Sequence, residues 1–79
     1  MLLLSCWRWA VKELTPHSPS ADLDVELLLA DVLGLTRAQL YSQKPDRMLL
    51  PAQQKMLKSL LWRRKAGEPV AYLLGRQEF

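Results

Sequence analysis

The sequence predicts an all-α domain, a small bundle of four helices followed by a short fifth helix. Apolar residues recur at helical spacing in several stretches of the 79-residue chain. Glycine and proline separate these stretches, at positions where helices typically end and begin. Hydrophobic residues make up 49% of the chain, which is enough for one small core. The expected helices span residues 2–14, 20–33, 36–43, 51–66 and 69–74.

The first predicted helix carries one apolar face, at positions three or four residues apart. This face consists of Leu3 or Leu4, Trp7, Ala10 or Val11, and Leu14. Trp9 lies about 200° around the helix from Trp7, among polar residues. A tryptophan in that position is either partly covered at the surface or in contact with another domain or partner. We therefore count Trp9 among the candidate partner-binding residues.

A turn cluster with two prolines leads into the second predicted helix. It holds His17, the only histidine of the chain. We expect His17 to be a solvated loop residue, because no other metal-ligating side chain stands at ligand spacing from it. Either Ser18 or Ser20 is expected to cap the second helix, and Gly34 to end it.

The second predicted helix has the strongest apolar pattern. Its main stripe is expected to hold Val25, Leu28, Leu29, Val32 and Leu33, widened by Ala21 and Leu27. Acidic residues take remaining positions, at Asp22, Asp24, Glu26 and Asp31. Paired carboxylates could serve acid–base chemistry or hold a metal, but nothing in the sequence encloses these. We expect a solvated acidic face whose first residues complement the helix dipole.

A capping-box pattern opens the short third predicted helix, with Thr36 as N-cap and Gln39 three residues later. A helix of two turns is not stable alone in water. Its face of Leu40 and Tyr41 is therefore expected to dock on the other helices. A helix-turn-helix interpretation is weak, because base-reading side chains are few in this helix: Arg37, Gln39 and Gln43.

The fourth predicted helix begins at Pro51, a residue favoured at the first helical position. Leu50 is a poor cap, so we expect the first turn to fray. The buried stripe is expected to hold Met56, Leu57, Leu60 and Leu61. The helix ends in Arg63, Arg64 and Lys65, where cations complement the helix dipole and Glu68 is near enough to pair. This basic triplet could instead contact a partner protein or a catalytic domain, or, less plausibly, RNA or DNA.

The overall composition indicates a protein of a reducing, intracellular compartment. The formal net charge is +3, from 11 basic and 8 acidic residues, a mild excess that does not by itself indicate nucleic acid. The single cysteine, Cys6, excludes an intrachain disulfide and is expected to be a small buried or half-buried apolar residue. The apolar start at residues 1–4 is too short for a signal peptide or a membrane span. Phosphate-binding loops, catalytic triads and zinc-type spacings do not occur.

Residues 67–79 contain closely spaced residues of the kinds that end and begin helices. Gly67 suits the position after a helix, Pro69 suits the first position of a fifth helix, and Gly75 is expected to stop that helix. The segment Arg63–Gly75, followed by Glu78 and Phe79, closely resembles the end of the N-terminal helical domain of the HemK/PrmC family. A second match is the stretch of residues 24–35, where a helix ends at a glycine before the short third helix, in the order that the family uses. This family comprises the peptide-chain release factor glutamine methyltransferases.

The resemblance implies a division of labour along a longer chain. Residues 1–74 would form a helical substrate-recognition domain, and residues 75–79 would begin the linker to an absent Rossmann-like catalytic domain. Members of the family use S-adenosylmethionine to methylate the glutamine of the Gly-Gly-Gln motif in class-one release factors. Their Gly-rich cofactor loop and Asn-Pro-Pro-Tyr motif do not occur here. We therefore expect no cofactor-binding, metal-binding or catalytic residues in this chain, which alone would not be catalytic.

The expected partners are a release factor and the protein's own catalytic domain. We expect a cytoplasmic monomer that binds neither membrane nor nucleic acid. The candidate partner-binding residues are Trp9, Arg37, Arg63, Arg64 and Arg76. Two alternatives remain open, a stand-alone helical adaptor and a small basic nucleic-acid-binding module. The reading frame beyond Phe79 distinguishes the family domain from the adaptor.

Overall fold

The computed structural model describes residues 1–75, and this part of the chain is all-α as predicted. Its helices are α1 (Leu3–Leu14), α2 (Ala21–Leu33), α3 (Arg37–Tyr41), α4 (Pro51–Lys65) and α5 (Val70–Gly75), with a 3-10 turn η1 at Thr15–His17. Within the described residues, β-structure is limited to one isolated bridge between Leu2 and Met48. The predictions for Arg76 and for the tail up to Phe79 lie outside the described residues.

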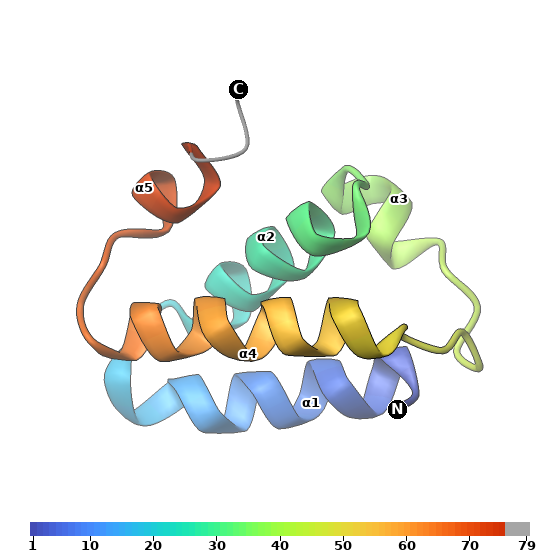
Figure 1. Ribbon diagram of the computed structural model, residues 1–79, viewed down its shortest axis with the longest axis horizontal. Coiled ribbons are helices and arrows are strands. Elements are labelled where there is room, and N and C mark those ends of the chain that lie inside the picture. The colour runs from blue at the N-terminus through green and yellow to red at the C-terminus, as the bar shows by residue number, and fades with distance from the viewer. Residues whose placement is uncertain (76–79) are drawn as a thin grey trace.

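Helix α2 is the centre of the bundle and contacts each of the other four helices. Figure 1 shows α1 and α4 side by side and running in the same direction, with α2 crossing them obliquely. The core between these helices is mostly leucine. Its largest fully buried side chains are Leu14, Val25, Leu28, Leu29, Leu40, Leu57, Leu60, Leu61 and Leu73. The apolar stripes predicted for the first two helices thus supply much of the core, with Val32, Leu33 and Trp7 partly buried against it.

The backbone just before α1 pairs with the segment that leads into α4. The Leu3 amide donates to the Arg47 carbonyl at 2.7 Å, and the Leu49 amide donates to the Met1 carbonyl at 3.0 Å. These bonds place the first turns of α1 and α4 next to each other. Leu49, which is 3% exposed, is packed into the core there.

The helix ends follow the predicted local signals closely. Gly34 is left-handed with φ 70°, which an L side chain rarely adopts, and it ends α2 as expected. The capping box is confirmed, because the Gln39 amide donates to Thr36 Oγ1 at 3.1 Å and the Thr36 amide donates to Gln39 Oε1 at 2.9 Å. Helix α3 is shorter than expected and ends at Tyr41. Helix α4 begins at Pro51 as predicted, and the Leu50 amide just before it donates a hydrogen bond to Gln53 Oε1 at 2.9 Å.

Two expectations about burial are wrong. Asp24 and Glu26 do not lie on a solvated face, since they are only 5% and 8% exposed. Both carboxylates point towards basic side chains from other parts of the chain, which compensates the cost of burying charge. Met56 is 41% exposed, because the face of α4 that meets the core runs through Leu57, Leu60 and Leu61.

Candidate functional site

The basic triplet at the end of α4 is fully engaged within the chain. Arg63 forms a two-pronged salt bridge with Glu68, with Nη2 2.7 Å from Oε1 and Nε 2.8 Å from Oε2. Arg64 Nε donates to Asp24 Oδ2 at 3.0 Å, and Lys65 Nζ donates to Glu13 Oε1 at 2.9 Å. The hydrogen bonds between these two side chains lower the pKa of Glu68 and raise the pKa of Arg63. The triplet is adjacent in sequence, but its members have three different partners.

Asp24 is the centre of a buried polar cluster at this end of the bundle. Its Oδ2 accepts a hydrogen bond from Ser18 Oγ at 2.7 Å, and its Oδ1 accepts one from Ser20 Oγ at 3.1 Å. Arg64 adds a weaker bond from Nη2 to Ser18 Oγ at 3.3 Å and one from Nη1 to the Glu68 carbonyl at 3.4 Å. The cluster therefore joins the start of α2, the end of α4 and the connection to α5. Ser20 stands at the N-cap of α2, but its hydroxyl binds Asp24 instead of capping the helix backbone.

A second ion pair joins α2 to α3. Arg37 donates from Nη2 and Nε to Glu26 Oε1 at 2.7 and 3.1 Å. The Tyr41 hydroxyl, and then Arg37, lower the pKa of Glu26 through hydrogen bonding. Hydrogen bonding to Glu26 in turn raises the pKa of Arg37 and the pKa of Tyr41. Arg37 stays 51% exposed although Glu26 is largely covered, so one side of the guanidinium faces solvent.

Trp9 is a partly buried residue that packs against the edge of the core. Lys58 Nζ, from α4, lies 5.9 Å from the centre of its ring, within the range of a cation–π contact. This environment agrees with the interpretation of Trp9 as a partly covered surface side chain. Of the other helices, the structure brings α4 close to Trp9, through Lys58.

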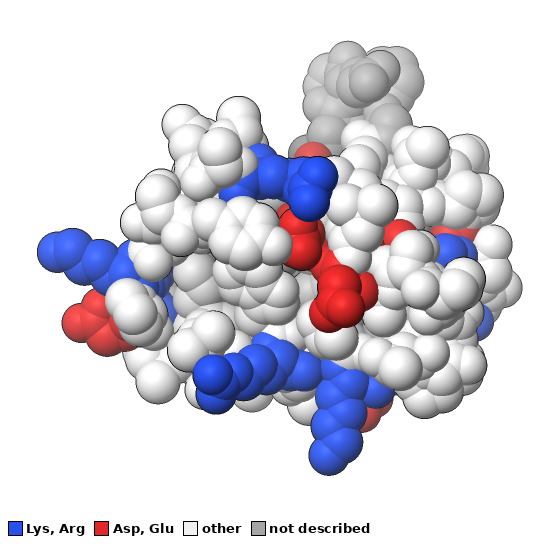
Figure 2. Space-filling view, turned by 180° about the vertical axis from the view of Figure 1, so that it is seen from behind, with Lys and Arg blue, Asp and Glu red and all other residues white. Residues whose placement is uncertain are grey.

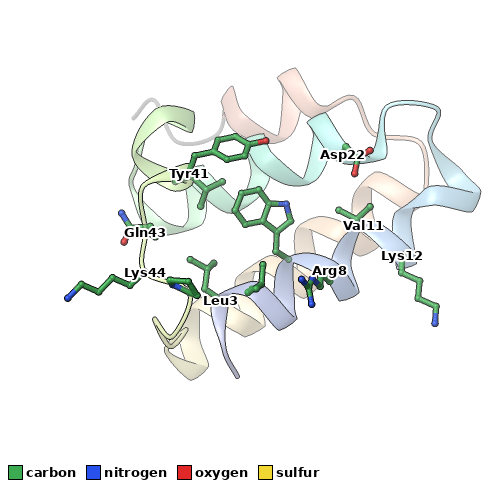
Figure 3. Close-up of a pocket in the computed structure, with 12 residues that line it drawn as sticks. Leu3, Arg8, Val11, Lys12, Asp22, Tyr41, Gln43 and Lys44 are labelled. Carbon is green, nitrogen blue, oxygen red and sulfur yellow. The ribbon is translucent and has the colours of Figure 1, made fainter.

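A groove that the sequence analysis missed lies between α1 and α3. We call it the α1–α3 groove; its volume is about 560 Å³ and its apolar lining includes Leu3, Leu4, Trp7, Val11, Leu40 and Tyr41. The rings of Trp7 and Tyr41 meet edge to face, with centroids 5.3 Å apart and an interplanar angle of 62°. Figure 3 shows Tyr41 from α3 across the groove from Leu3 and Val11 of α1. Tyr41 is 61% exposed and Leu4 is 39% exposed, so the apolar walls are open to solvent.

The edge of the α1–α3 groove is charged. Arg8 and Lys12 of α1 line one side, Lys44 lies beyond the end of α3, and Asp22 of α2 is on the opposite side from α1 (Figure 3). All four side chains belong to exposed residues. Within residues 1–75, Arg8, Lys12 and Lys44 form neither a salt bridge nor a side-chain hydrogen bond, unlike the triplet of α4. Figure 2 shows this face as a hollow of uncharged surface with basic side chains at its left, lower and upper edges and acidic ones on its right.

The sequence did hold one signal for this groove. Arg8 and Lys12 are one helical turn apart, directly beside Trp7 and Val11 of the apolar face, and so flank it. The contributions of Tyr41 and Lys44 could not be found in this way, because they come from a segment at least 29 residues later in the chain than Arg8 and Lys12.

Other reactive groups have ordinary surroundings. Cys6 is buried in the core as expected, and burial raises the pKa of its thiol. His17 is exposed in the turn η1. No group of three or more His, Cys, Asp or Glu residues that could hold a metal ion occurs among the described residues. Of the helices in this part of the chain, none has the length and apolar character needed to cross a membrane.

Fold and surfaces together define a small helical domain, with a leucine core, ion pairs between distant helices, and an open apolar groove between α1 and α3. The family model for the PrmC N-terminal domain matches residues 5–75, and the chain belongs to this family. The predicted family resemblance is thereby confirmed.

Named relatives support the same assignment. The chain is 46% identical over 68 residues to the release factor glutamine methyltransferase of Coxiella burnetii, an alignment that covers 86% of this chain and 24% of that protein. It is 40% identical over 72 residues to the release factor glutamine methyltransferase of Shewanella oneidensis, covering 91% of this chain and 25% of that protein. It is 45% identical over 64 residues to the release factor glutamine methyltransferase of Pseudomonas aeruginosa, covering 81% of this chain and 23% of that protein. The chain thus spans about a quarter of the length of these relatives.

Proposed function

We propose that this chain is the substrate-docking domain of an S-adenosylmethionine-dependent methyltransferase that modifies the Gly-Gly-Gln glutamine of class-one release factors in translation termination. In this proposal, residues 1–74 hold the release factor and residues 75–79 begin the linker to a catalytic domain. The observation that carries it is the family match over residues 5–75, together with relatives named release factor glutamine methyltransferase. The protein would act as a cytoplasmic monomer.

A docking domain contributes to such a reaction through positioning. The reacting group of a protein substrate is one side-chain amide at the surface of a large molecule. Contacts made by remote parts of that molecule hold the amide near the methyl donor, which lowers the entropic part of the barrier. The groups available for this role in the present chain are its exposed aromatic, apolar and basic side chains, and none of them needs to touch the reacting atoms.

S-adenosylmethionine itself does not fit the hollow described here. A nucleoside cofactor is usually held by a carboxylate on its ribose hydroxyls and by backbone amides of a Gly-rich loop. The α1–α3 groove has an apolar lining, and its acidic lining residue, Asp22, is exposed at the edge. We therefore assign cofactor binding to the proposed catalytic domain, and derive no chemical step from this chain.

Trp9, Arg37, Arg63, Arg64 and Arg76 remain the residues proposed from the sequence to contact the release factor. For three of the arginines, the exposed fraction of the side chain indicates how available each is to a partner. Arg37 keeps half of its surface and Arg63 about a third, while Arg64 is 19% exposed and bound to Asp24. Reversing the charges of Arg63 and Arg64 in the full-length enzyme is expected to raise the KM for release factor. An unchanged KM would remove both residues from the interface.

The proposed function is tested by removing residues 1–74 from the full-length enzyme. The truncated enzyme should show a KM for release factor raised at least tenfold, while its affinity for S-adenosylmethionine stays within about twofold. The reason is that only the remote contacts are lost, and a tenfold change corresponds to about 1.4 kcal/mol of binding free energy. A KM that does not change would exclude a docking role for this domain.

A further inference from the structure

The α1–α3 groove combines exposed apolar surface with unpaired charge. Trp7 and Tyr41 form its aromatic wall, and partner-binding surfaces typically centre on such residues. Arg8 and Lys12 on α1, and Lys44 after α3, form no salt bridge with an acidic side chain within residues 1–75. An open apolar hollow with free cations at its edge has the chemistry of a surface that a complementary acidic segment would cover.

We propose that the α1–α3 groove binds an amphipathic helix of the protein substrate, with an apolar ridge against Trp7 and Tyr41 and carboxylates along the flank that faces α1. The proposal rests on the proposed function in one respect, that the protein substrate is a release factor. It deepens that function by naming the face of the domain and the chemistry of the segment held there.

The spacing of the charges supports a helical ligand. Arg8 and Lys12 are separated by one turn, about 6 Å along α1. Two carboxylates one turn apart on a helix lying alongside α1 have the same separation and can face both cations. Asp22, on the opposite side of the groove, would then meet a basic residue on the other flank of the bound helix (Figure 3). This polarity sets which flank of the ligand lies against α1.

The free cations at the groove also explain why the end of α4 is the poorer docking surface. A partner carboxylate that binds Arg64 or Arg63 must displace Asp24 or Glu68, each of which is already within hydrogen-bonding distance. A carboxylate that binds Arg8 or Lys12 displaces only water. Electrostatic attraction at the groove is therefore available to a ligand without the loss of an internal ion pair.

The test compares two charge variants of the complete chain. Arg8→Glu/Lys12→Glu changes the edge of the groove. Ala52→Glu/Lys55→Glu/Ser59→Glu makes the same change in net charge on α4, at exposed residues outside the groove lining and away from Trp9. The dissociation constant for a class-one release factor is measured by calorimetry for each chain. The groove variant should bind at least tenfold more weakly than the unmodified chain, and the control within about twofold.

The position of the ligand is read from the indole N–H resonances of the three tryptophans. Release factor should shift the resonance of Trp7, in the groove, and leave that of Trp62, which is 74% exposed on α4, unchanged. Unaltered binding by the groove variant, equal losses in both variants, or a shift confined to Trp62 would overturn the proposal while leaving the docking function intact.

A chain that does not bind release factor at all would instead count against the proposed function. The groove is then judged with a designed peptide of about four helical turns, with leucines on one face and glutamates on its flank, and with a twin that carries lysines there. The acidic peptide should shift Trp7 and the basic twin should not. Equal shifts by both peptides, the absence of any shift, or stronger binding of an RNA oligonucleotide at Trp7 would overturn the inference.

Discussion

The last turn of α4 and the edge of the α1–α3 groove each present three cations, but the surroundings of the two sets differ. At the end of α4, Arg63, Arg64 and Lys65 all bind carboxylates of the chain at 2.7–3.0 Å. At the groove, the three basic side chains lack such partners within residues 1–75. A run of cations in a sequence is therefore a poor guide to a binding surface when acidic residues from distant elements reach it.

The difference has a structural consequence for each region. The end of α4 holds the bundle together, because Asp24 and Glu13 belong to α2 and α1 and the bonds cross between helices. The groove edge contributes little to the folded state, since its charges are solvated. Substitutions at the first region should accordingly lower the stability of the fold, whatever they do to binding. Substitutions at the second region should change binding with little loss of stability.

Removing the carboxylate of Asp24 should produce the largest effect. Asp24→Ala removes the carboxylate that binds Arg64 and accepts the hydrogen bond of Ser18, and should lower the free energy of unfolding by about 2–3 kcal/mol. Asp22→Ala, two residues earlier on the same helix and exposed, is the matched control and should change it by less than about 0.5 kcal/mol. Urea unfolding followed by circular dichroism measures both. Similar losses for the two variants would remove the distinction between the two regions.

Helix α3 forms one wall of the groove, so the groove depends on the local signals that fold this short helix. Thr36→Ala removes the hydroxyl that accepts a hydrogen bond from the Gln39 amide, and should lower the free energy of unfolding by about 1 kcal/mol. The control is Ser42→Ala at the other end of the helix, where an exposed hydroxyl bonds to the Gln39 carbonyl. Thermal unfolding should show the larger decrease for Thr36→Ala. Equal decreases would mean that tertiary packing, and not the capping box, fixes this short helix.

The hydrogen bond of Glu26 with Tyr41, together with its ion pair with Arg37, makes the stability of the fold depend on pH. The folded pKa of Glu26 is lowered below its ordinary value of 4.5, so its stabilising contribution is complete above that value and is lost as the pH falls towards the folded pKa. Melting temperatures measured between pH 6 and pH 3 should therefore fall more steeply for the unmodified chain than for Glu26→Gln. Parallel curves would show that Glu26 does not contribute to the acid dependence.

Charge reversal at the groove should have the smallest effect on folding. The free energy of unfolding of Arg8→Glu/Lys12→Glu should remain within about 1 kcal/mol of the unmodified chain, as expected for two exposed positions without internal partners. The same urea experiment measures it. A loss comparable to that of Asp24→Ala would place these cations among the structural ones, and the contrast between the two regions would disappear.

Much of the fold could be predicted because its signals are local. Gly34, the pair Thr36 and Gln39, and Pro51 each define a helix end through the backbone geometry or hydrogen bonds of their immediate neighbours. The predicted helix ends were less accurate where such signals were weak, as at Tyr41. Apolar spacing also identified most of the core, but Met56 was placed on the wrong side of the boundary between core and surface.

The candidate sites were less predictable, because they depend on side chains that meet across the bundle. Asp24 and Arg64 are 40 residues apart and Glu13 and Lys65 are 52 residues apart, so no local pattern could indicate that these charges are paired. The α1–α3 groove likewise needs Tyr41 to lie beside Trp7.

The sequence by itself determined the helical class, the order of the elements, the core stripes and the family. Short-range steric limits and helical periodicity encode these features, and both act between residues a few positions apart. Only the tertiary structure decided which charges are structural and which are free. That outcome depends on the packing of α1, α2 and α4 around one core, which brings some carboxylates to distant cations and leaves the cations of the groove facing water.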